Sequence, residues 1–239
     1  MHTHTDKLIA NIRILLFLCS LLVVNNCSCN EPSKTIEAIL FLGNSGAGKS
    51  TLCNSVFQEA VFSSGVSLYS GMTLYNQAHT YHNTLYIDTP GLSELLTRER
   101  VAKEIEVALK KNLNYKIVFV ITLISGSLYL TDIAAIDRVC DAIRVPFEYG
   151  LIFNKVSQGL SKAINQEGLD SYLALFKKKP SATVILTLDR EIEDEDNRYF
   201  KPDSENRKKL LEFLSKLKST LIHESDVKSL NIANYGQRP

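Results

Sequence analysis

Eight consecutive residues near the beginning of the chain have the side chains and the spacing needed to hold a phosphate group. Residues 43–50 read G-x-x-x-x-G-K-S. Glycines let the backbone turn and bring several N–H groups close to phosphate oxygens without a Cβ in the way. Lys49 adds a positive charge that can reach the β- and γ-phosphates, and the Ser50 hydroxyl is placed to ligate Mg²⁺. The pattern therefore predicts a phosphate-binding loop.

The segments on either side of this loop have the apolar patterns of a strand and a helix. Residues 36–42 form a nearly continuous apolar run, which is typical of a short parallel strand buried on both faces. Residues 51–56 continue as a helix, whose positive dipole end would face the phosphates. A glycine-rich turn without a ligand would leave both segments unexplained. The residues predicted to contact the phosphates are Gly43, Asn44, Ser45, Gly46, Ala47, Gly48, Lys49, Ser50 and Thr51.

A second candidate group follows a predicted hairpin. Residues 73–81 and 84–88 are rich in aromatic and β-branched side chains and flank a two-residue turn, which predicts two antiparallel strands. The second strand ends in D-T-P-G, where the Asp88 carboxylate can hold the shell of a Mg²⁺ ion and the Gly91 N–H can meet a γ-phosphate. The same four residues also suit an ordinary turn. Their position downstream of the phosphate loop favours a nucleotide site.

The rest of the chain alternates between helical and strand patterns. Strands are predicted at residues 115–122, 149–153 and 183–187, the last of these being the final strand; helices are predicted at residues 98–111, 131–143, 167–177 and from Pro202 and Ser204 through Leu221. Such alternation predicts an α/β fold with a mainly parallel sheet, helices on both faces and ligands at the carboxyl ends of the strands. Gly43, Asp88 and Asn154 all lie at such ends.

The order of these motifs resembles that of the small P-loop GTPases over residues 36–222. Residues 62–65, 70–73 and 87–92 are similar to the Era-like and septin-related branch, which includes the immunity-associated GTPases. The resemblance implies a three-layer P-loop nucleotide-hydrolase fold. It also implies a G domain at residues 36–222 that binds a guanine nucleotide, GTP or GDP, together with Mg²⁺.

The resemblance also implies roles for single residues. Thr73 stands where the family has the threonine that ligates Mg²⁺ and contacts the γ-phosphate, with Ser70 as the alternative. Asn154 and Lys155 match the start of the base-reading N-K-x-D motif, although the pair would also suit an ordinary strand end. The implied Mg²⁺ ligands are Ser50, Thr73 and Asp88, and the implied catalytic residues are Lys49, Thr73 and Gly91.

Two positions depart from the family pattern. Ser157 stands where the family has the Asp that accepts hydrogen bonds from guanine N1 and N2. Hydrogen bonds to a charged group are worth about 1.5 to 3 kcal/mol, so guanine affinity is expected to be about ten- to a hundredfold lower, and the preference for GTP over ATP weaker, than in relatives with the full motif. Leu92 follows Gly91 where some members carry a water-orienting Gln. Slow hydrolysis is therefore expected from the isolated domain.

Three functions compete on this basis. The first is a Mg²⁺-dependent GTPase that hydrolyses GTP to GDP and phosphate as a switch, aided by an activating protein or by a nucleotide-dependent homodimer. The second is a nucleotide-dependent assembly module with negligible hydrolysis. A P-loop kinase is disfavoured because the D-T-P-G and N-K motifs suit the GTPase order. Nucleotide turnover separates the first two.

The composition of the chain indicates which partners to expect, how many domains it can form and whether its cysteines are paired. The chain has 27 basic and 26 acidic residues, a net charge of +1, so no nucleic-acid partner is expected. Its 239 residues, 45% hydrophobic, suit one α/β domain with an ample core. Cys53 and Cys140 fall on apolar faces of predicted helices, which predicts buried free thiols instead of a disulfide.

The two ends of the chain read as separate pieces. Residues 1–29 have a lightly basic start, a short apolar core and a small, polar end, the layout of a secretory signal peptide. A membrane-anchoring helix and a mitochondrial presequence remain as alternatives. The signal-peptide and anchor readings place the protein on the secretory route or at a membrane, while a cytoplasmic location follows if the segment is not a signal. Residues 223–239 are expected to form a loose tail.

Overall fold

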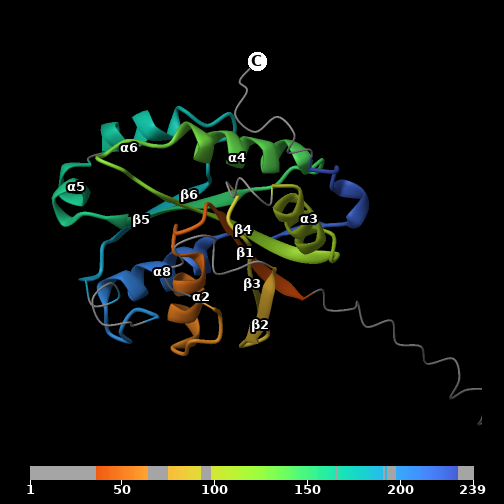
Figure 1. Ribbon diagram of the computed structural model, residues 1–239, viewed down its shortest axis with the longest axis horizontal. Helices are drawn as coiled ribbons and strands as arrows, with labels where there is room; N and C mark the ends of the chain where they lie inside the picture. The colour runs from red at the N-terminus through yellow and green to blue at the C-terminus, as the bar shows by residue number, and fades with distance from the viewer. Residues whose placement is uncertain are drawn as a thin grey trace, which may run out of the picture. The chain divides into compact units, whose positions relative to one another are not determined.

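The computed structural model describes residues 36–63, 75–92, 98–164, 166–190, 192 and 198–230. Within them, seven strands form one sheet in the order β2-β3-β1-β4-β5-β6, with β7 paired to β4 (Figure 1). Pairs β1–β3, β1–β4, β4–β5 and β5–β6 are parallel, and β2–β3 and β4–β7 are antiparallel. The strands are β1 (Glu37–Gly43), β2 (Gln77–Tyr81), β3 (Thr84–Asp88), β4 (Leu113–Thr122), β5 (Tyr149–Val156), β6 (Ala182–Thr187) and β7 (Thr220–Ile222).

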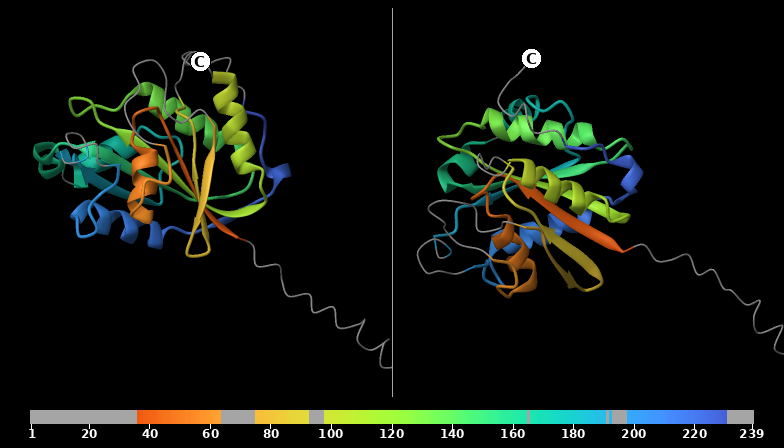
Figure 2. Two further views of the ribbon diagram at one scale, coloured as in Figure 1. Left: turned by 60° about the horizontal axis from the view of Figure 1, so that its bottom comes forward. Right: turned by 45° about the vertical axis from the view of Figure 1, so that its right-hand side comes forward.

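Helices cover both faces of this sheet (Figures 1 and 2). On one face lie α3 (Arg98–Leu109), α4 (Leu130–Ala142) and α6 (Gln166–Leu173), and on the other lie α2 (Lys49–Phe57) and α8 (Glu205–Lys216). Each face has its own apolar core. The short helix α5 (Gln158–Ala163) follows β5, and a 3-10 helix, η1 (Glu224–Asp226), follows β7. The predicted three-layer α/β fold is confirmed.

The predicted hairpin is confirmed, with one shorter strand. β2 and β3 pair antiparallel through His82 and Asn83, whose φ angles of 45° and 64° are those of a tight hairpin turn. Strand β2 begins at Gln77, because Tyr75 and Asn76 are not extended in the sheet. Thr73, the predicted start, lies outside the described residues.

The later part of the chain differs from the prediction at β5, α8 and β7, and α6 ends at Leu173, short of the predicted residue 177. Helix α8 ends at Lys216, so Leu221, the predicted last residue of that helix, lies instead in β7, where it is 40% exposed. The final strand is therefore β7 and not β6, because β7 pairs with Leu113–Tyr115, the start of β4 that β5 does not reach. Strand β5 also runs three residues beyond the predicted end, to Val156.

The first part of the expected tail is also ordered. Val227 forms an isolated bridge with Ile143, and the N–H of Lys228 donates to the carbonyl of Ala142 at 2.8 Å. Val227 is buried against the end of α4. A loose tail from residue 223 is therefore wrong for residues 223–230, and residues 231–239 lie outside the described part of the chain.

Cys53 and Cys140 are buried free cysteines, as predicted. Burial raises the pKa of the Cys140 thiol to about 12, which keeps it protonated and unreactive. Among the described residues, no helix has the length and apolar character needed to cross a membrane. The predicted signal or anchor at residues 1–29 lies outside those residues.

Candidate functional site

The phosphate loop connects β1 to α2 and is held closely by the chain around it. At Gly48 the backbone has a φ of 95°, a left-handed conformation that favours glycine. A Cβ at Gly48 would lie 2.4 Å from Asn154 Nδ2, so a larger residue would displace that side-chain amide. The N–H of Ala47 donates to the carbonyl of Asn44 at 3.2 Å, which closes the turn.

Lys49 lies against this loop and is only 6% exposed. Its Nζ donates to the carbonyl oxygens of Gly43 at 3.0 Å and of Asn44 at 3.1 Å. A buried ammonium group needs such acceptors, and the loop supplies them from its own backbone. Lys49 thus lies at the phosphate loop as predicted, but it folds onto the loop carbonyls and does not extend into solvent.

Two of the three predicted Mg²⁺ ligands are in direct contact. The Ser50 hydroxyl donates to Asp88 Oδ2 at 2.6 Å, and Asp88 is fully buried. Asp88 reaches this position because it pairs with Phe41 across β1 and β3, directly below the phosphate loop. Hydroxyl and carboxylate oxygens are the hard ligands that Mg²⁺ prefers, and phosphates and waters complete its shell in this kind of site.

A ligand set of that kind needs few protein groups. Among the described residues no cluster of three or more His, Cys, Asp or Glu residues could hold a metal ion by itself. The Ser50–Asp88 pair nevertheless fits a Mg²⁺ ion that is shared with a phosphate. Thr73, the third predicted ligand, and its alternative Ser70 lie outside the described residues.

The D-T-P-G turn is fastened to the phosphate loop. The Thr89 hydroxyl donates to the carbonyl of Phe41 at 2.8 Å, and the N–H of Leu92 donates to the carbonyl of Gly43 at 3.1 Å. A Cβ at Gly91 would lie 2.4 Å from the backbone nitrogen of Ser45, so the two loops touch only because position 91 is glycine. The predicted γ-phosphate sensor therefore contacts the predicted phosphate cradle.

Leu92 points away from this contact. It is 1% exposed and packs in the core on the face of α3 and α4. A side chain in that core has no access to a water molecule at the phosphates. The position that some family members use to orient water is here a packing position.

On the base side, Asn154 joins β5 to the phosphate loop. Its Nδ2 donates to the carbonyl of Ala47 at 2.8 Å, and the side chain is 4% exposed. Lys155, with a φ of 57°, is exposed beside it, and its Cε lies 3.8 Å from where a Cβ at Gly48 would be. Ser157 is the N-cap of α5, since its Oγ accepts a hydrogen bond from the N–H of Leu160 at 3.3 Å.

Sequence reasoning missed Asp132, in the first turn of α4. Asn44 Nδ2 of the phosphate loop donates to Asp132 Oδ1, and Asp132 is 5% exposed. Burial raises the pKa of this carboxyl from 3.8 to about 6. An Asp in the first turn of a helix ordinarily faces solvent near the positive dipole end, so the sequence carries no signal that this one turns inward.

Comparison with known families identifies the domain. Residues 38–155 match the family described as 50S ribosome-binding GTPase. With the fold, the order of motifs and the Ser50–Asp88 contact, this match defines a P-loop GTPase G domain. The Era-like, septin-related branch remains a prediction. No curated protein sequence matches the chain.

Solved structures have the same fold. Toc33 from Arabidopsis thaliana in complex with Mg²⁺ and GMPPNP is 19% identical over 81% of this chain and 90% of that one, with a TM-score of 0.50. A structure of the chloroplast translocon components atToc33 and psToc159 is 17% identical over 81% and 88% of the chains, with a TM-score of 0.53. NFeoB from S. thermophilus bound to GDP, AlF₄⁻ and K⁺ is 17% identical over 82% of this chain and 65% of that chain, with a TM-score of 0.47.

Proposed function

We propose that the protein binds GTP and GDP with Mg²⁺ and hydrolyses GTP slowly, as a switch. The observation that carries the proposal is the Ser50–Asp88 contact of 2.6 Å directly beneath the phosphate loop. It joins the hydroxyl and the carboxylate that a nucleotide-bound Mg²⁺ requires, next to the Lys49 ammonium. Thr73 and Gly91 would sense the γ-phosphate, one from each loop.

Binding is tested by calorimetry with GTP and GDP, with and without Mg²⁺. Lys49→Ala is expected to abolish triphosphate binding, because it removes the point charge at the β- and γ-phosphates. Lys216→Ala is the matched control, since Lys216 pairs with Glu212 on the exposed surface of α8. Both variants are first checked for folding by circular dichroism. A folded Lys49→Ala protein with normal affinity for GTP would exclude the phosphate-loop assignment.

Slow hydrolysis follows from the position of Leu92. Phosphoryl transfer depends on positioning and electrostatics, and even small GTPases with an orienting Gln turn over alone at only about 10⁻⁴ to 10⁻² per second. With Leu92 in the core, the isolated domain is expected at or below the slow end of that range. Faster turnover requires a group from outside, which an activating protein or a second copy would supply.

The second copy has support from the surface and from a relative. Ile124 and Tyr129, between β4 and α4, and Leu130, the first residue of α4, are all about half exposed. Tyr129 and Leu130 come just before Asp132, which contacts the phosphate loop. For atToc33 and psToc159, dimerization is described as important for GTPase activity. GTP hydrolysis per molecule over a wide range of protein concentration is the test. A rise with concentration supports a homodimer, and a flat, slow rate supports an activating protein or the alternative function, a non-hydrolysing assembly module.

We further propose that residues 1–29 direct the protein to a membrane or to the secretory route. The support is their basic start, short apolar core and small, polar end. A reporter fused to residues 1–30 is expected to follow that route in cells. A reporter that stays diffuse in the cytosol would rule the targeting role out.

A further inference from the structure

We propose that the Asp189 carboxylate reads the guanine base, in place of the Asp that related GTPases carry at the position of Ser157. The inference rests on the proposed function, because it assigns the base-reading group of the same nucleotide site. Because Ser157 replaces that Asp, the sequence motifs alone give the guanine base no carboxylate to accept its hydrogen bonds. The ends of β5 and β6 supply one from the neighbouring strand.

The two positions lie just beyond the paired ends of the neighbouring strands β5 and β6. Val156 pairs with Thr187, and the N–H of Leu188 donates to the carbonyl of Val156 at 2.8 Å. Ser157 directly follows Val156, and Asp189 directly follows Leu188. Because neighbouring strands lie about 4.8 Å apart, a carboxylate at position 189 begins about one strand spacing sideways and one residue further along the chain from where the family's carboxylate begins, at the same carboxyl edge.

Both positions line one hollow. It has a volume of about 700 Å³ and is lined by residues 157–159, 187–190 and 204–206. That volume lies within the range of about 300–1,000 Å³ that small-molecule sites occupy. The hollow begins three residues after Asn154, whose side chain holds the phosphate loop. A nucleotide with its phosphates in that loop would therefore have its base near these walls.

The end of β6 is held rigidly, which a specificity residue requires. Asn206, in α8, accepts from the Thr187 N–H at 3.0 Å and from its hydroxyl at 3.2 Å, and donates back to the Thr187 carbonyl at 2.8 Å. The Ser204 hydroxyl caps α8 by accepting from the N–H of Arg207 at 3.2 Å. Asp189 thus begins only two residues beyond a residue fixed at three points.

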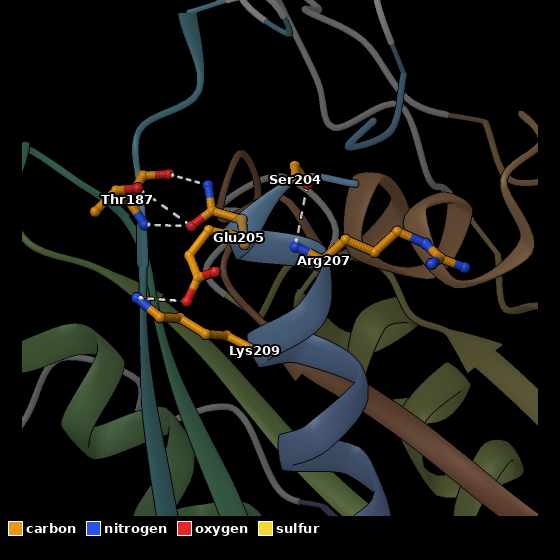
Figure 3. Close-up of polar contacts among 6 residues, drawn as sticks. Thr187, Ser204, Glu205, Arg207 and Lys209 are labelled. Atoms are coloured by element: carbon orange, nitrogen blue, oxygen red, sulfur yellow. Dashed lines mark hydrogen bonds and ion pairs between the residues drawn. The ribbon is translucent and has the colours of Figure 1, made fainter. Parts of the chain in front are cut away.

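Glu205 is the other carboxylate on these walls, and its surroundings suit a different role. Its Oε1 lies 3.8 Å from Lys209 Nζ one turn along α8, and its side chain is 71% exposed (Figure 3). Asp189 is partly buried and lies directly after the strand. Asp189 also directly precedes the helical residue Arg190. Its carboxylate could therefore cap that helix, and a test must separate this structural role from base reading.

Asp189→Asn makes that separation, because Asn caps helices as well as Asp does. A carboxylate accepts hydrogen bonds from guanine N1 and from the exocyclic amino group. A carboxamide can instead donate to the carbonyl oxygen that xanthine carries in place of that amino group. We expect the full-length variant to bind GTP about ten- to a hundredfold more weakly and to bind xanthosine triphosphate more tightly than the wild type does.

The measurement is the Kd of each protein for GTP, ATP and xanthosine triphosphate, with circular dichroism to show folding. Glu212→Gln, on the exposed surface of α8 and outside the hollow, is the matched carboxylate-to-amide control and is expected to leave all three Kd values unchanged. Adding Ser157→Asp to Asp189→Asn is expected to restore GTP preference, since Asp also caps α5.

The outcomes separate the two proposals. Unchanged selectivity in Asp189→Asn, or an equal loss for all three nucleotides, would overturn base reading by Asp189 and leave the proposed function standing. A wild-type protein that binds none of the three would overturn both.

Discussion

Replacing Asp132 by Asn should stabilise the protein at neutral pH, although it changes a side chain in contact with the phosphate loop. Asp132 is 5% exposed, and its carboxylate accepts a hydrogen bond from Asn44. Burial raises its pKa from 3.8 to about 6, so the folded protein binds the proton more tightly than the unfolded chain does. The charged carboxylate is therefore a cost that the fold carries at pH 7.

The size and sign of the effect follow from the two pKa values. The difference between about 6 and 3.8 is about 2.2, which at about 1.36 kcal/mol per unit gives at most about 3 kcal/mol. Below pH 3.8 both states are protonated, and the cost is absent. As the pH rises to 6, the unfolded chain ionises first, so the free energy of unfolding falls, and above 6 the full cost applies.

The amide introduced by Asp132→Asn would carry no such cost and would still accept from Asn44 through its oxygen. A charge-assisted hydrogen bond becomes a neutral one, which offsets part of the gain. The expected net stabilisation of Asp132→Asn at pH 7.5 is about 1–3 kcal/mol, and it should shrink toward zero near pH 4.

Urea unfolding of both proteins between pH 4 and 8 measures this difference. Asp141→Asn, on the same helix, is the matched control, because Asp141 is largely exposed and pairs only with the exposed Lys177 among the described contacts. A difference that does not change with pH, or an Asp132→Asn protein less stable than the wild type at pH 7.5, would refute the reasoning.

Three further predictions concern positions where the packing leaves no room. Gly91→Ala should weaken binding of a non-hydrolysable GTP analogue about tenfold relative to GDP, measured by calorimetry, because the added Cβ meets the phosphate-loop backbone at 2.4 Å. Gly150→Val should lower the free energy of unfolding by about 1–3 kcal/mol, since its Cβ would lie 2.5 Å from Phe213 Cζ. Gly159→Ala is the control and should leave the free energy of unfolding unchanged, because no atom lies within 4 Å of the added Cβ. Leu92→Gln should destabilise the fold by about 1–3 kcal/mol and leave GTP turnover slow; a faster rate in that variant would contradict the assignment of Leu92 to the core.

The sequence predicted the part of the site that depends on strand ends and on the phosphate-loop motif. Gly43, Asp88 and Asn154 could be placed together because buried apolar runs mark parallel strands, and the carboxyl ends of such strands share one edge. The Asp132 contact could not be predicted, because it depends on how α4 approaches a loop 88 residues earlier in the chain. The end of α8 was missed for a similar reason. Leu221 continues the helical spacing, but pairing with β4 outweighs that local preference.

The two departures from the family pattern, Leu92 and Ser157, differ in whether the fold could accept the residue that the family carries at that position. Leu92 fills a core position, so restoring a Gln there would bury an amide without bringing it to the phosphates. Ser157 caps α5 from an exposed turn, and Asp would cap it equally well, so the fold places no barrier against a carboxylate at that position. The absence of a water-orienting Gln at position 92 is therefore built into the packing, and under the proposed function faster hydrolysis is expected to depend on another molecule. The absence of a carboxylate at position 157 is not required by the packing, and in our proposal Asp189, at the end of the neighbouring strand, supplies the carboxylate for the base instead.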